Sequence, residues 1–118
     1  MTETDLKQIV IKALEDLKAN NIVELDVSGL TDMTDLMIVA SGTSSRHVKA
    51  LADNVVSEVK KQGVQPTGVE GEQTGDWVLV DLADILVHVM LPETREFYNL
   101  EKLWSLSQPR DMQDQRPG

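Results

Sequence analysis

Apolar residues recur at helical spacing near the start of the chain. Between residues 4 and 20 they fall on one face of a helix: Leu6, Ile9, Val10, Ala13, Leu14 and Leu17. This period predicts an amphipathic helix. Thr2 and Asp5 have the spacing of a capping box at its start. Asn20 and Asn21 are predicted to end it.

Two strand patterns follow this helix. Residues 22–27 alternate apolar Val23, Leu25 and Val27 with acidic residues, which predicts a half-exposed strand. Residues 36–40, LMIVA, are continuously apolar, as in a strand that is buried on both faces.

A second amphipathic helix is predicted over residues 45–62. Ser and Thr residues in SGTSSRH (41–47) are suited to cap its start, and Gly63 is suited to its C-terminal cap. Its apolar stripe consists of Val48, Leu51, Ala52, Val55 and Val59. The glycine-containing segment 66–76 that follows is interpreted as a loop or an irregular edge strand.

Residues 77–91 predict a β-hairpin that turns at Ala83-Asp84. On one face Trp77 is then opposite Met90, Leu79 is opposite His88, and Asp81 is opposite Leu86. The other face is aliphatic throughout and is predicted to be core: Val78, Val80, Leu82, Ile85, Val87, Val89 and Leu91. The Trp-His-Asp-Met face is chemically different and is a candidate contact surface. A slip of one residue in either strand would exchange that strand's faces.

A third helix is predicted from Pro92, which fits the first helical position. It places Phe97, Leu100 and Trp104 near one side, with Tyr98 elsewhere. Residues 107–118 are polar and are predicted to form a flexible tail. The element order is therefore α-β-β-α-β-β-α. It indicates one α/β domain over residues 1–106, with a mixed sheet packed against helices.

Composition narrows the function classes. The 118 residues include no cysteine, which excludes a disulfide scaffold, a thiolate metal site and a cysteine nucleophile. The net charge of −9 opposes a broad grip on nucleic-acid phosphates, so no direct DNA binding is expected. It favours a small ligand or a basic protein partner. With no apolar N-terminal segment and no apolar run near ~20 residues, neither a signal peptide nor a membrane span is expected, and the predicted location is cytoplasmic.

Residues 42–47 allow a phosphate-binding alternative. Gly42, Thr43 and Ser44 lie between a buried strand and a helix start, where backbone N–H groups and the helix dipole favour anions. This layout resembles the start of a nucleotidyltransferase site. That chemistry needs several carboxylates around metal, and only Asp53 lies in the following helix. The competing interpretation is a capped helix start, and no metal or cofactor is predicted.

The hairpin also carries three polar candidates: His88, Asp81 and Asp84. His88 is either a hydrogen-bonded sheet histidine or part of a contact patch. Asp84 is explained by turn chemistry. Asp81 interrupts an apolar strand and must find solvent, a hydrogen bond or a cation, such as a basic side chain of another protein. His47 is interpreted as solvated or as a local cap.

The segment DWVLVDLADILVHVMLPETREFYNLEKLW, together with DLMIVASGTSSRHVKALADNV, resembles the ribosomal silencing factor family, RsfS, also called Iojap. The resemblance spans about residues 5–106. Where the family pattern has an aromatic residue and a glycine between the two hairpin aspartates, this chain has Leu82 and Ala83.

The resemblance implies a nucleotidyltransferase-like fold without catalytic carboxylates. It also implies binding to ribosomal protein uL14 on the large ribosomal subunit. The bound factor would sterically block joining of the small subunit and repress translation under nutrient limitation. A homodimer of the free protein is a further implication. The residues expected at the uL14 contact are Trp77, Asp81, Leu82, Asp84, His88, Met90 and Tyr98.

Three functions therefore remain as hypotheses. The first is a non-enzymatic translation repressor that acts by steric exclusion. The second is a nucleotide- or phosphate-binding enzyme that uses residues 42–47. The third is a large-subunit assembly factor without silencing activity.

Overall fold

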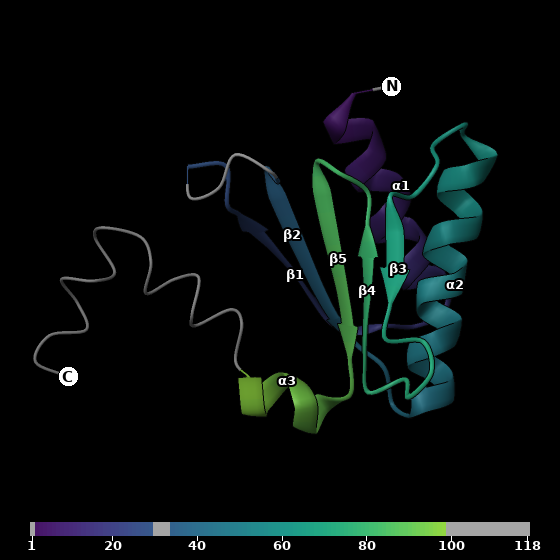
Figure 1. Ribbon diagram of the computed structural model, residues 1–118, viewed down its shortest axis with the longest axis vertical. Helices are drawn as coiled ribbons and strands as arrows, with labels where there is room; N and C mark the ends of the chain where they lie inside the picture. The colour runs from purple at the N-terminus through teal and green to yellow at the C-terminus, as the bar shows by residue number, and fades with distance from the viewer. Residues whose placement is uncertain (1, 30–33, 99–118) are drawn as a thin grey trace, which may run out of the picture.

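The computed structural model describes residues 2–29 and 34–98, which form a five-stranded sheet with helices (Figure 1). The strand order is β1-β2-β5-β4-β3. The elements, in chain order, are α1 (Glu3–Asp16), β1 (Asn20–Asp26), β2 (Leu36–Ser41), α2 (Ser45–Lys61), β3 (Gly68–Glu70), β4 (Trp77–Asp81), β5 (Ile85–Met90) and α3 (Pro92–Tyr98).

The sheet is mixed, as predicted. β2 and β5 are parallel, and the other neighbouring pairs are antiparallel. The predicted element order has one strand too few, because residues 68–70 pair with β4 as the short edge strand β3. The alternative of an irregular edge strand is therefore confirmed over the loop. Three residues without a clear period carry too little pattern to predict a strand from sequence.

The ends of the first two helices follow from backbone geometry. The capping box of Thr2 and Asp5 is confirmed, but α1 ends at Asp16, before the predicted position. Lys18 has a left-handed φ of 61°, and the Ala19 N–H donates to the Leu14 carbonyl oxygen at 3.0 Å. This is a Schellman termination. Gly63 ends α2 in the same way, with a φ of 84°.

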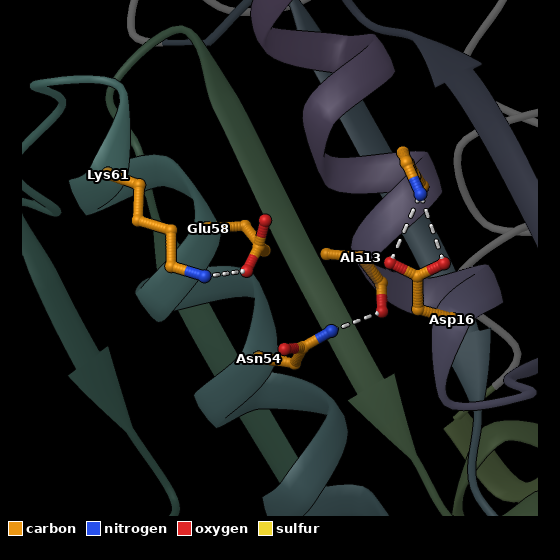
Figure 2. Close-up of polar contacts among 6 residues, drawn as sticks. Ala13, Asp16, Asn54, Glu58 and Lys61 are labelled. Carbon is orange, nitrogen blue, oxygen red and sulfur yellow. Dashed lines mark hydrogen bonds and ion pairs between the residues drawn. The ribbon is translucent and has the colours of Figure 1, made fainter.

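Both long helices pack on one face of the sheet (Figure 1). The predicted stripe of α2 and the aliphatic hairpin face meet there in one core with α1. Figure 2 shows how α1 and α2 are also joined by a hydrogen bond, since Asn54 Nδ2 donates to the Ala13 carbonyl oxygen at 2.8 Å. The exposed ion pairs in the same view, Lys12–Asp16 and Lys61–Glu58, contribute little to stability.

The opposite face of the sheet has its own smaller apolar cluster. It contains Val27, Met37, Val39 and Met90, with Leu25 and Trp77 packed against it. The hairpin register is the predicted one: Trp77 pairs with Met90, Leu79 with His88, and Asp81 with Leu86. The candidate contact face of the hairpin therefore lies on the side of the sheet away from α1 and α2.

Candidate functional site

Trp77 is held in place by its neighbour on β5. Its side chain is half-buried, and its indole Nε1–H donates to His88 Nδ1 at 2.9 Å. The two ring centroids are 5.8 Å apart with an interplanar angle of 48°. The hydrogen bond reaches diagonally across the β4–β5 ladder, so the correct hairpin register is what brings the two rings together.

His88 is a buried, neutral histidine. Its side chain is 7% exposed, and burial lowers its pKa to about 4. Because Nδ1 accepts the Trp77 proton, the ring's own proton lies on Nε2. Nε2 is buried and has no hydrogen-bond partner among the described residues. His88 is thus a hydrogen-bonded sheet histidine through Nδ1, and its place in a contact patch stays a prediction.

The burial of His88 predicts a loss of stability in mild acid. Its folded pKa of about 4 lies below the ordinary value of 6.5, so the unfolded chain takes up the proton first. The contribution of the neutral His88 ring to the free energy of unfolding is constant above about pH 6.5. We expect the free energy of unfolding to fall as the pH drops from there toward 4, by about 2.5 kcal/mol at pH 4.5. Urea unfolding at pH 7 and pH 4.5 measures it.

His88→Asn is the control for this acid effect, because an amide does not titrate. The variant should lose about 2.5 kcal/mol less than the wild type between the two pH values. An equal loss in both proteins would assign the acid sensitivity to the carboxylates instead.

A shallow recess lies beside the Trp77–His88 pair. It has a volume of about 200 Å³ and is lined by Glu70, Gly71, Trp77, Leu79 and His88. Gly71 shapes its wall: its φ is 90°, and a Cβ there would overlap the Trp77 carbonyl oxygen. The β3–β4 connection therefore reaches Trp77 only because residue 71 has no side chain.

The hairpin tip explains Asp81 without an outside partner. Asp81 Oδ1 accepts the Ala83 N–H at 2.8 Å, and the Asp84 N–H donates to the Leu82 carbonyl oxygen at 3.0 Å. These bonds close a tight turn with Ala83 at a φ of 71°. Asp81 thus has the hydrogen bond that its place in an apolar strand requires, and Asp84 is exposed at the tip.

Thr34 fastens this tip to the segment before β2. Its Oγ1 donates to the Ala83 carbonyl oxygen at 3.1 Å, and the N–H groups of Asp35 and Leu36 both donate to the Asp84 carbonyl oxygen. Sequence reasoning missed Thr34. Its only signal is a polar residue shortly before a buried strand, which does not reveal a contact 49 positions away.

We predict that Ala83→Gly stabilises the protein by about 1 kcal/mol. Alanine is strained at a φ of 71°, whereas glycine adopts this region at little cost. Chemical denaturation measures the gain in the free energy of unfolding. Ala83→Val is the matched control and should destabilise the fold. A lower stability of Ala83→Gly than of wild type would contradict the prediction.

Two residues predicted to contact a partner are buried instead. Met90 is 0% exposed in the smaller cluster, and Leu82 is 5% exposed in the main core beneath the helices. In this chain Met90 supports Trp77, and Leu82 belongs to the aliphatic face. Their place in a partner contact stays a prediction. Tyr98 closes α3, but its side chain lies outside the described part of the chain, as do Leu100, Trp104 and the tail.

The 42–47 loop is a capped helix start. Ser44 Oγ accepts the His47 N–H at 3.1 Å, and His47 Nδ1 accepts the Thr43 N–H at 2.8 Å. His47 Nε2 then donates to the Leu17 carbonyl oxygen at 2.7 Å, which ties the loop to the end of α1. These two N–H groups, which a phosphate would need, already have internal acceptors.

Carboxylates do not gather into a metal site in the described ranges. No group of three or more His, Cys, Asp or Glu side chains there could hold a metal ion. Asp53 instead hydrogen-bonds Glu72, which raises the pKa of Glu72. No helix in the described part of the chain is long and apolar enough to cross a membrane.

The model of the family described as "Ribosomal silencing factor during starvation" matches residues 1–117. Ribosomal silencing factor RsfS of Chromobacterium violaceum is 49% identical over 105 residues, 89% of this chain and 86% of that protein. A crystal structure of a Chromobacterium violaceum protein, at 49% identity, superposes with a TM-score of 0.87 over 88% of this chain and 87% of that chain.

A more distant relative comes from mouse. The protein named "Mitochondrial assembly of ribosomal large subunit protein 1" is 36% identical over 101 residues, 83% of this chain and 44% of that protein.

Proposed function

The chain belongs to the ribosomal silencing factor family, RsfS, and from this premise we propose that it represses translation by binding ribosomal protein uL14 on the large ribosomal subunit. The bound protein would block joining of the small subunit by its bulk. Such a protein needs no catalytic side chain, and it would act on ribosomes in the cytoplasm under nutrient limitation.

The observation that carries this proposal is the position of Trp77. It lies on the sheet face away from α1 and α2, and its hydrogen bond to His88 fixes its indole ring. A rigid, half-buried tryptophan is the kind of anchor that dominates protein–protein contacts. We place Trp77 at the centre of the uL14 contact, with Leu79 beside it.

Charge supports a basic partner at the same face. Glu70, which lines the recess beside Trp77, and Asp84, at the hairpin tip, are both exposed carboxylates, and the whole chain carries a net charge of −9. An acidic surface speeds encounter with a basic protein. We keep Asp84 and Tyr98 as proposed contacts, and assign Asp81 to shaping the turn that presents Asp84.

Sedimentation tests the proposal directly. The purified chain is mixed with isolated large subunits, isolated small subunits and intact bacterial ribosomes, and each mixture is separated on a sucrose gradient. We expect the chain to travel with large subunits alone. In a joining assay, saturated large subunits should form few intact ribosomes when small subunits are added. Comigration with small subunits would contradict the proposal.

The assembly-factor alternative rests on the name of the mouse relative. The joining assay separates the two functions, because a pure assembly factor would bind large subunits and leave joining unchanged. A homodimer of the free chain is also proposed; light scattering with and without purified uL14 tests whether the second copy and uL14 compete.

A further inference from the structure

His88 carries a proton donor that the described part of the chain does not use. Nδ1 accepts the indole proton of Trp77, which leaves the ring's own proton on Nε2. Nε2 is buried without a hydrogen-bond partner among the described residues, and the side chain is 7% exposed. An unpaired buried donor destabilises the state that contains it, so such a group calls for a physical reason.

The same side chain lines the recess beside Trp77. The recess of about 200 Å³ has room for several heavy atoms, because one liquid water takes up about 30 Å³. Leu79 is half-buried and pairs with His88 across the β4–β5 ladder. Nε2 is buried, so a partner reaches it only if a neighbouring side chain moves. Leu79 lines the same recess, and it is the side chain that we take to move, with the backbone of the sheet unchanged.

We propose that this recess receives a neutral hydrogen-bond acceptor from the protein partner, and that His88 Nε2–H donates to it. A main-chain carbonyl or a side-chain amide oxygen has this chemistry. The inference rests on the proposed function, which places the recess inside the contact with a ribosomal protein.

The charges around the recess select the class of acceptor. A lysine or arginine head group has no lone pair to accept the Nε2 proton. An anionic acceptor would lie near the exposed carboxylate of Glu70, on a chain of net charge −9. A neutral oxygen accepts the proton without either conflict, and a basic group next to it can pair with Glu70.

The unused donor would also give the contact selectivity. A partner that covers the recess without supplying an acceptor leaves Nε2 buried and unpaired in the complex, as in the free chain. A partner with the oxygen in place gains a hydrogen bond that the free chain lacks. Sites with buried polar groups discriminate strongly on this basis.

Two substitutions of His88 separate its nitrogen atoms. His88→Asn keeps an acceptor near the position of Nδ1 for Trp77 and removes the donor at Nε2. His88→Gln places an amide N–H near the position of Nε2 and gives up the acceptor for Trp77. Affinity for isolated large subunits is measured for both, together with the thermal midpoint at pH 7.

We expect His88→Asn to bind about tenfold more weakly, with a thermal midpoint within a few degrees of wild type. His88→Gln should bind more tightly than His88→Asn. The inference is overturned if His88→Asn binds as wild type does, or if both variants lose affinity equally.

A third variant, Trp77→Ala, distinguishes a failure of this inference from a failure of the proposed function. If Trp77→Ala loses affinity and His88→Asn does not, the proposed acceptor in the recess is contradicted, while the proposed contact face is supported. If neither variant loses affinity, the contact face itself is wrong. Nitrogen-resolved NMR gives an independent readout: the His88 Nε2–H signal should shift downfield when purified uL14 is added, and an unchanged signal contradicts the inference.

Discussion

Trp77→Ala is expected to weaken binding to the large ribosomal subunit more than a hundredfold, or about 3 kcal/mol. The substitution removes a half-buried indole that is fixed by His88 Nδ1 at 2.9 Å. It leaves the main core untouched, because that core lies on the opposite face of the sheet. Sedimentation of the variant with isolated large subunits at several concentrations gives the affinity.

Leu17→Ala is the matched control for this loss. Leu17 is 38% exposed at the C-terminal end of α1, which packs on the other face of the sheet. The Leu17→Ala substitution removes exposed apolar surface away from Trp77, so it should leave the affinity for large subunits within about twofold of wild type. If Trp77→Ala stays folded and binds as tightly as this control, the hairpin face is not the site of ribosome contact.

Gly71→Ala is expected to lower the free energy of unfolding by about 4 kcal/mol. Part of the loss comes from the φ of 90°, which an L side chain rarely adopts. The larger part comes from the overlap of the new Cβ with the Trp77 carbonyl oxygen, since backbone atoms on both sides must move apart. Urea denaturation followed by circular dichroism measures the change.

Gly68→Ala is the control for the glycine substitution. Gly68 begins the short edge strand β3, which ends one residue before Gly71, and a Cβ at Gly68 would meet no atom within 4 Å. Its stability should stay within about 1 kcal/mol of wild type. Equal losses at positions 68 and 71 would show that this edge of the sheet tolerates no added side chain, rather than that Gly71 has a specific role.

The predictions for Trp77 and Gly71 concern the same part of the molecule, the start of β4 and the connection that packs against it. Gly71 allows the β3–β4 connection to approach Trp77, and His88 holds the Trp77 ring once β4 has paired with β5. Gly71→Ala should therefore also reduce ribosome binding through Trp77, in addition to its effect on stability. The acidity of the exposed tip and recess would add a salt-dependent attraction to the proposed basic partner.

The hydrophobic pattern of the sequence was enough to predict the α/β class, the two long helices and the register of the hairpin. Each rests on a local period: the α2 stripe that ends at Val59, the continuous apolar run of β2, and the alternation on either side of Ala83-Asp84. Local periods are reliable because burial of one face is decided within the element itself. Family membership also followed from sequence, since the hairpin–helix motif is long and ordered.

Tertiary structure alone decided what each hairpin residue does. The sequence placed Trp77, His88 and Met90 on one face. It did not reveal that Met90 is fully buried while Trp77 is only half-buried. Nor could it reveal that Thr34 fastens the turn, or that a left-handed Lys18 ends α1 early. The physical reason is common to all three findings. Burial, long-range hydrogen bonds and chain reversal depend on atoms that the fold brings together, whereas a pattern of polar and apolar positions along the chain records only which face a residue occupies.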